Sequence, residues 1–224
     1  MIGRIDDLDV LRPHLRVVGG SEFEPQPQAR LVTISPLQLE QVRAVCDAAL
    51  EQNVACCEDP TPAYAVALAG ELGLATESVE TVLLGAVLRD VGKLRVSRRV
   101  LFGLRPMTQY QLNYVRMHAE YSAQICESLE LPPAVAEVVR THHERWDGSG
   151  YVNGLKGVEV SLEGRIVALV DAYDSLTRRR LGKKCMSPSK ALQELHQGAW
   201  RLYDPHLVDA WEAVVGPGKT RGRV

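Results

Sequence analysis

Residues 79–90 read VETVLLGAVLRD, and nearly every position from Val79 to Leu88 is apolar or small. A helix that is apolar on all sides has no face for solvent, so other elements must surround it. Asp90 directly follows this apolar run. The sequence therefore predicts a buried central helix over about 77–88, with Asp90 at its carboxyl end.

Further helical patterns surround this segment in the sequence. Ser35-Pro36 and Ser187-Pro188 each place a capping hydroxyl before a proline that suits the first helical position, and Thr108 is a third predicted cap. Apolar spacing predicts other helices at about 35–50, 63–72, 108–129, 135–142, 166–170, 187–197 and 206–214. No segment of this core requires paired strands, so the predicted fold class is all-α.

The predicted helices define one domain over residues 35–216. Residues 1–34 are interrupted by prolines and glycines, and their pattern leaves a β-hairpin, an extended arm and a disordered lead-in open. Residues 217–224 are read as a flexible tail. The basic stretch 91–106 is predicted to be an irregular loop.

Composition excludes several classes of protein. The 224 residues carry 26 basic and 28 acidic side chains, a net charge of -2 that argues against non-specific nucleic-acid binding. The sequence lacks a run of about 18 apolar residues, so no membrane span is expected. The five cysteines are odd in number and form no paired CxxC spacing, which is typical of free thiols in a reducing cytoplasm. We therefore expect a cytoplasmic protein.

Five residues are candidate metal ligands. They are histidines and aspartates at helix ends or within apolar helices: Asp90, His118, His142, His143 and Asp171. Imidazole and carboxylate groups suit iron, manganese and zinc, and one aspartate can bridge two metals. Each residue alone has a simpler explanation, such as a hydrogen-bonded core histidine, or an Asp171 neutralised by an arginine.

Four segments carry a family resemblance in their order along the chain. They are LRDVGK at 88–93, His118 within MHAEYS, HHERWDGSGY at 142–151 and DAYDSL at 171–176. These segments are similar to the HD-GYP signature, in which HD-x-GK, a downstream histidine, HHE-x-x-DG-x-GYP and D-x-x-D-x-L follow one another. The resemblance covers about 35–215, and residues 202–205, LYDP, look like the family's closing FDP turn.

The resemblance implies an HD-domain helical bundle extended by the HD-GYP helices. It also implies a bi- or trinuclear metal centre, with iron or manganese favoured over zinc, that hydrolyses cyclic di-GMP. Asp90 would be the bridging, catalytic carboxylate. The three histidines named above would hold one metal and Asp171 would help to hold another. Lys93 would be the catalytic cation that contacts a substrate phosphate.

The chain departs from the family signature at three positions. Two of them affect the metal position that Asp171 would serve, here called the first metal position, and the third lies in the GYP loop. Arg89 replaces the histidine of the HD pair, and an arginine has no lone pair to donate to a metal. An upstream family histidine aligns near Cys57, and Val152 replaces the proline of the GYP triplet. We therefore predict one metal site or none. We also predict that the Arg89 guanidinium occupies the first metal position and pairs with Asp171 and Asp90; the alternative is that Arg89 points to solvent.

These features favour a degenerate HD-GYP module of bacterial cyclic-di-GMP signalling. Such a module would be weakly active or inactive and would act through binding, with Arg89 and Lys93 as phosphate contacts. A protein partner would dock on the loop Gly148–Gly157, which includes Gly150 and Tyr151, and a homodimer is left open. An active metal-dependent cyclic-di-GMP phosphodiesterase is the alternative. A general HD-type nucleotide phosphohydrolase is disfavoured, because that class depends most on the histidine that Arg89 replaces.

Overall fold

The protein is described by a computed structural model over residues 34–54, 59–103, 106–178 and 185–216, and these residues form helices and no strand. The predicted arm at 1–34, apart from Ile34, and the predicted tail at 217–224 lie outside the described residues. The elements are α1 (Pro36–Glu51), α2 (Thr61–Glu71), α3 (Thr76–Leu88), the 3₁₀ helix η3 (Val91–Arg95), α4 (Arg98–Leu101), α5 (Gln109–Arg116), α6 (His118–Ser128), α7 (Pro133–Thr141), the 3₁₀ helix η4 (Gly157–Glu159), α8 (Leu162–Thr177), α9 (Pro188–Gly198) and α10 (Pro205–Val215). The predicted all-α fold is confirmed.

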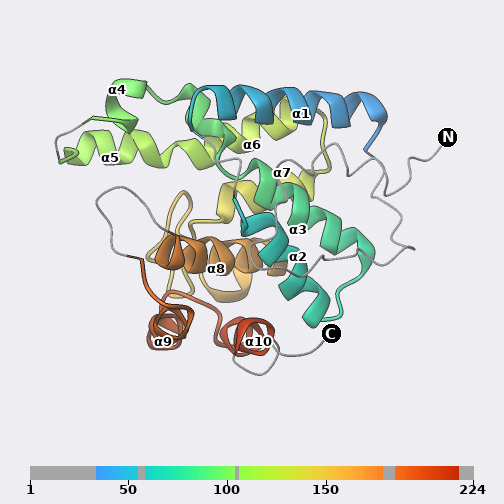
Figure 1. The fold of residues 1–224 in the computed structure, drawn as a ribbon. Helices are drawn as coiled ribbons and strands as arrows, with labels where there is room; N and C mark the ends of the chain where they lie inside the picture. The colour runs from blue at the N-terminus through green and yellow to red at the C-terminus, as the bar shows by residue number, and fades with distance from the viewer. Residues whose placement is uncertain (1–33, 55–58, 104–105, 179–184, 217–224) are drawn as a thin grey trace.

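Helix α3 is the centre of the bundle. It packs against α2, α7 and α8, and Figure 1 shows α1, α4, α5 and α6 on one side of these helices and α9 and α10 on the other. Val82 and Ala86 of α3 belong to one apolar cluster, shared with α2, α8, α9 and α10. Leu84 and Leu88 belong to a second cluster, shared with α1, α6 and α7. Helix α3 therefore packs into apolar clusters on two faces, and this agrees with the buried central helix that its sequence predicts.

Local capping explains where the helices begin. The side-chain oxygens of Ser35, Thr108 and Ser187 accept hydrogen bonds from backbone N–H groups in the first turns of α1, α5 and α9. Ser35 and Thr108 also form capping boxes, in which the glutamine at the third helical position bonds back to the cap backbone. The predicted caps are therefore confirmed.

The structure corrects two local predictions. The helix expected over 108–129 is interrupted at Met117, so that α6 begins at His118. The stretch 91–106 contains η3 and the short α4, because the chain coils tightly after Asp90 instead of forming a loop. Of two tryptophans near the carboxyl end, Trp211 is fully buried and Trp200 is 65% exposed.

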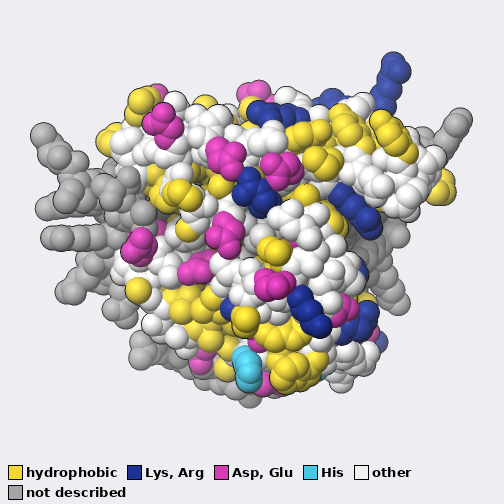
Figure 2. Space-filling model, turned by 180° about the vertical axis from the view of Figure 1, so that it is seen from behind, with side chains coloured by type: hydrophobic (Ala, Val, Ile, Leu, Met, Phe, Trp, Pro, Cys, Tyr) yellow, Lys and Arg dark blue, Asp and Glu magenta, His cyan; other side chains and the backbone are white. Residues whose placement is uncertain are grey.

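The surface agrees with the small net charge. On the face drawn in Figure 2, acidic and basic side chains of the described residues are interspersed. A protein that tracks a nucleic-acid backbone would gather its basic side chains along one face. Among the described residues, no helix is both long enough and apolar enough to cross a lipid bilayer.

Candidate metal centre

Three histidines from two parts of the chain meet in the interior. His118 begins α6, whereas His142 and His143 directly follow α7. One ring nitrogen from each histidine lies within 4.8 Å of the others. The ring centroid of His118 is 5.4 Å from that of His142 and 5.1 Å from that of His143. The packing of α6 on α7 therefore assembles the three histidines that the sequence predicts as ligands.

Two of these imidazoles are oriented by backbone carbonyls. Nδ1 of His118 lies 2.8 Å from the carbonyl oxygen of Val115, and Nδ1 of His142 lies 2.7 Å from that of Val139. A carbonyl can only accept a hydrogen bond, so each Nδ1 carries the proton and each Nε2 carries a lone pair. Both Nε2 atoms are buried without a hydrogen-bond partner. Buried nitrogens without partners are costly unless they bind a ligand, and this arrangement fits a metal ion.

The imidazoles are held in the uncharged form that a metal requires. Burial lowers the pKa of His142 well below its usual value, and the neighbouring His143 and His118 lower it further. Burial and His118 lower the pKa of His143 to about 4. Burial also lowers the pKa of His118, although Asp90 opposes this. All three rings are therefore neutral near pH 7 and can act as ligands.

Asp90 lies beside the three histidines. Its Oδ1 is 2.7 Å from Nζ of Lys93 and 3.4 Å from Nε2 of His118. Burial opposes ionisation of Asp90, but Lys93, Arg89 and the histidines hold the pKa of its carboxyl well below the usual value. An ionised carboxylate beside three neutral imidazoles is a ligand set that suits a divalent cation.

Gly92 allows η3 to lie close to α6. A Cβ atom at Gly92 would lie 2.0 Å from the carbonyl oxygen of His118 and 2.4 Å from the backbone nitrogen of Ser122. The Ser122 hydroxyl donates to the carbonyl of Arg89 at 2.8 Å and accepts from Gly92 N–H at 2.8 Å. These contacts fix the distance between Asp90 and His118, because only a residue without a side chain fits between the two backbones.

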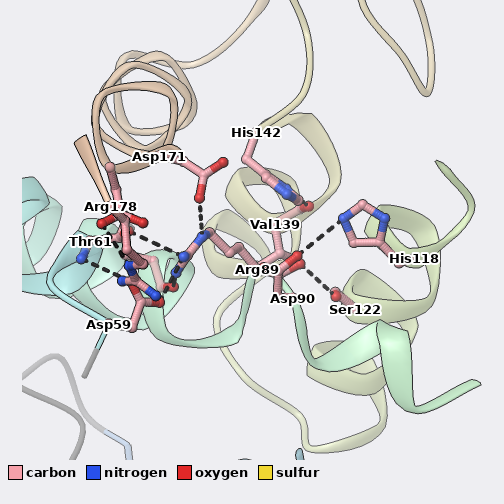
Figure 3. A network of polar contacts seen from close by, with 12 residues as sticks. Asp59, Thr61, Arg89, Asp90, His118, Ser122, Val139, His142, Asp171 and Arg178 are labelled. Carbon is pink, nitrogen blue, oxygen red and sulfur yellow. Dashed lines mark hydrogen bonds and ion pairs between the residues drawn. The ribbon is translucent and has the colours of Figure 1, made fainter. Parts of the chain in front are cut away.

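Arg89 points away from the histidines, into a separate cluster of carboxylates (Figure 3). Its guanidinium lies 2.8 Å from Asp171 and 2.7 Å from Asp59, and it donates to the carbonyl of Ala86 at 2.6 Å and to the hydroxyl of Thr61 at 3.2 Å. Arg89 is only 4% exposed. The predicted pairing with Asp171 is therefore confirmed, and the alternative in which Arg89 points to solvent is wrong.

Asp90, the other predicted partner of Arg89, forms its ion pair with another residue. Among the described residues, Asp90 pairs with Lys93 instead of Arg89, because the Arg89 side chain turns toward α2 and α8. Burial opposes the charge of Arg89, but Asp59, Asp171 and Asp90 outweigh this effect and raise its pKa. Arg89 is therefore a permanent cation in the interior.

Two charged residues of this cluster, Asp59 and Arg178, were not predicted from the sequence. Asp59, just before α2, also pairs with Arg178 at 2.8 Å, and Arg178 pairs with Asp174 at 3.0 Å. Burial opposes ionisation of Asp59, but Arg89 and the hydrogen bonds of Thr61 lower its pKa. The four-residue spacing between Asp174 on α8 and Arg178, which directly follows α8, was a usable signal, whereas nothing in the sequence marks Asp59. The Cys57 position, aligned with an upstream histidine, lies outside the described residues.

The glycine-rich loop carries Tyr151 to the histidines. Glu144 is buried, and its Oε1 accepts from the backbone nitrogens of Asn153 at 2.7 Å and Gly154 at 3.0 Å. A Cβ atom at Gly150 would lie 2.5 Å from a backbone nitrogen of the same loop, and Gly148 has a φ of 80°. The ring centroid of Tyr151 lies 4.8 Å from that of His143. The loop is therefore closed on itself, with Tyr151 against the candidate centre.

Known proteins share this fold and parts of this sequence. The chain is 33% identical over 146 residues to a cyclic di-GMP phosphodiesterase of Thermotoga maritima, a match that covers 64% of this chain and 40% of the relative. It is 34% identical over 145 residues to the cyclic di-GMP phosphodiesterase response regulator RpfG of Xanthomonas campestris, covering 64% and 38%. The chain thus spans about two fifths of the length of these curated relatives.

A solved structure shows the same fold. A cyclic GMP-AMP-specific phosphodiesterase of Vibrio cholerae superposes with a TM-score of 0.59 at 17% identity, over 82% of this chain and 50% of that one. At that identity the likeness concerns the fold alone. The HD domain family matches residues 35–207, which is most of the chain. With the helical fold and the histidine cluster, this match shows that the chain belongs to the HD domain family.

Proposed function

We propose that this HD domain is a module of cyclic-dinucleotide signalling that has kept one metal position and replaced the other with an arginine. The observation that carries the proposal is the buried Arg89 guanidinium, which pairs with both Asp59 and Asp171. In this proposal, His118, His142, His143 and Asp90 hold a single divalent metal. The domain then cleaves phosphodiesters weakly or not at all, and it acts by binding a ligand or a partner.

Electrostatics supports the replacement of a metal by Arg89. Two carboxylates in a protein interior require a cation, and a guanidinium supplies charge and hydrogen bonds to both. A guanidinium cannot bind or activate a water molecule as a metal does. A cleavage reaction that needs two metals at one phosphate would therefore lack one of them at this position.

The ligand class is inferred from the relatives and from Lys93. The relatives in Thermotoga maritima and Xanthomonas campestris are named cyclic di-GMP phosphodiesterases, which supports a cyclic dinucleotide as the ligand here. Lys93 lies beside Asp90 with its side chain partly exposed, so it can contact a phosphate next to the candidate centre. Arg89 was also expected to contact a phosphate, but its donors already bind Asp59, Asp171, Ala86 and Thr61. The proposal therefore assigns the phosphate contact to Lys93.

An active phosphodiesterase remains the second candidate function. The buried Nε2 atoms of His118 and His142, without partners in the described structure, favour it. These nitrogens, His143 and Asp90 would bind one metal, which would supply an activated water and polarise a phosphoryl oxygen. Lys93 would orient the phosphate. A protein partner on the loop Gly148–Gly157 is a further proposal, supported by Val158, a large apolar side chain that is exposed in η4, directly after that loop.

Metal content and cleavage of cyclic di-GMP together test the main proposal. We expect at most one metal per chain in protein purified anaerobically without chelator, and slow or undetectable cleavage. Arg89→His frees Asp171 and restores one imidazole, so its metal content should rise. Arg140→His is the matched control, because Arg140 also pairs with two carboxylates, Glu120 and Glu127, and neither of them is a candidate metal ligand. Two metals per chain in the unmodified protein, with rapid cleavage, would establish the second candidate instead.

A further inference from the structure

A stack of three side chains leads outward from the histidine cluster. The Tyr151 ring lies on His143, with centroids 4.8 Å apart and planes tilted by 34°. The guanidinium carbon of Arg116 lies over the same tyrosine ring, 5.1 Å from its centroid. Arg116 is the last residue of α5 and is exposed, two positions before His118. The stack therefore joins a surface cation to the candidate metal centre.

The charge of Arg116 is not neutralised within the described part of the chain. There, Arg89, Arg140, Arg165 and Arg178 each pair with a carboxylate, whereas Arg116 contacts the Tyr151 ring and no carboxylate. A ring beneath a guanidinium restricts its motion while its N–H groups stay free to bond elsewhere. A cation that is held in place without a counter-ion is suited to bind an anion.

Tyr151 is half-buried, and its ring lies against both His143 and the guanidinium of Arg116. Two carboxylates of the interior already have cations, because Asp90 pairs with Lys93 and Asp171 pairs with Arg89.

We propose that Arg116, held by the Tyr151 ring, binds a phosphate group of the ligand beside the three-histidine centre. A guanidinium matches the geometry of phosphate through two parallel hydrogen bonds. A cyclic dinucleotide carries two phosphates, and Lys93 on η3 and Arg116 on α5 give each phosphate a separate cation. This assignment of the second phosphate rests on the proposed function, whereas the anion contact itself does not.

Binding measurements on the whole chain test the assignment. Affinities for cyclic di-GMP, cyclic di-AMP and inorganic pyrophosphate are compared by calorimetry in the unmodified protein, Arg116→Ala and Arg116→Lys. Because Arg116→Ala loses a charge-assisted contact, its affinity for each of the three probes should be about tenfold lower. Arg116→Lys should retain part of the affinity. Arg43→Ala removes an exposed arginine from the outer face of α1 and should bind as the unmodified protein does.

A second variant separates phosphate binding from a structural role. Tyr151→Phe keeps the ring under the guanidinium, so its affinity for the probes should equal that of the unmodified protein. Arg116→Ala should keep the melting temperature of the unmodified protein, because the arginine is proposed to bind a ligand and not to stabilise the fold. Equal affinities of Arg116→Ala and the unmodified protein for every probe would overturn the assignment. So would a loss confined to cyclic di-GMP, because that would indicate contact with guanine.

The outcome also separates this assignment from the proposed function. If the unmodified protein binds pyrophosphate through Arg116 but neither cyclic dinucleotide, the proposed ligand class is wrong and the phosphate contact stands. If it binds none of the three probes, both are wrong.

Discussion

Replacing Arg89 by methionine tests whether this residue is the cation that holds the first metal position. Methionine keeps much of the side-chain length but removes the charge, so Asp59 and Asp171 lose contacts of 2.7 and 2.8 Å. Removing one partner of a buried ion pair costs about 3–5 kcal/mol. Two features favour the lower end. Asp59 keeps Arg178 at 2.8 Å, and the side chain of Asp171 is 20% exposed and can be hydrated.

We therefore expect Arg89→Met to lower the free energy of unfolding by about 3 kcal/mol. For a domain of this size, that corresponds to a melting temperature lower by about 6–12 °C. The assay is equilibrium unfolding in urea with chelator present, so that metal binding does not contribute. Arg140→Met is the control: Arg140 contacts Glu120 at 2.9 Å and Glu127 at 2.7 Å with its side chain 25% exposed, and its loss should cost less than about 1 kcal/mol.

A double variant makes the test sharper. Asp171→Asn removes one carboxylate that Arg89 neutralises, so Arg89→Met combined with Asp171→Asn should be more stable than Arg89→Met alone. If Arg89→Met costs no more than Arg140→Met, the guanidinium does not stabilise the carboxylate cluster, and the reasoning is refuted.

Three further predictions concern the rest of the domain. Gly92→Ala should abolish metal uptake in elemental analysis, because its Cβ would lie 2.0 Å from the carbonyl of His118, whereas Gly70→Ala, with open space around it, should leave uptake unchanged and raise stability by about 0.5–1 kcal/mol. Burial, and then Glu77, raise the pKa of Glu80 to about 7, so the folded protein binds more protons than the unfolded chain between about pH 4.5 and 7 and loses stability as pH rises through that window. Glu80→Gln should therefore stabilise the protein by about 2 kcal/mol at pH 8 and by little at pH 4 in urea unfolding, and equal effects at both pH values would contradict this. Chelator should leave the circular dichroism of the helices unchanged, because Arg89 holds α3 to α2 and α8 without metal; loss of helix would show that metal is needed for folding.

The candidate ligands show how far residue order can be used. His118, His142 and His143 were predicted as one ligand set, and α6 and α7 bring them together as expected. Asp171 was placed in a metal site as well, but in the structure it contacts Arg89 and is not among the grouped ligand atoms. The identity of residue 89 indicated this difference in advance, because an arginine cannot be a ligand.

The sequence by itself determined the helical class, the caps and the central helix. These features depend on neighbours within a few residues: the hydroxyl of Ser35 reaches its own helix, and the apolar run Val82–Leu88 leaves that part of α3 no solvent face. Only the tertiary structure decided that Asp59, and not Asp90, is the second carboxylate that neutralises Arg89. Asp171 lies 82 residues from Arg89, and Asp59 lies 119 residues from its second partner, Arg178. Such pairs form because packed helices bring distant charges together in a medium that does not solvate them, and no local pattern records that proximity.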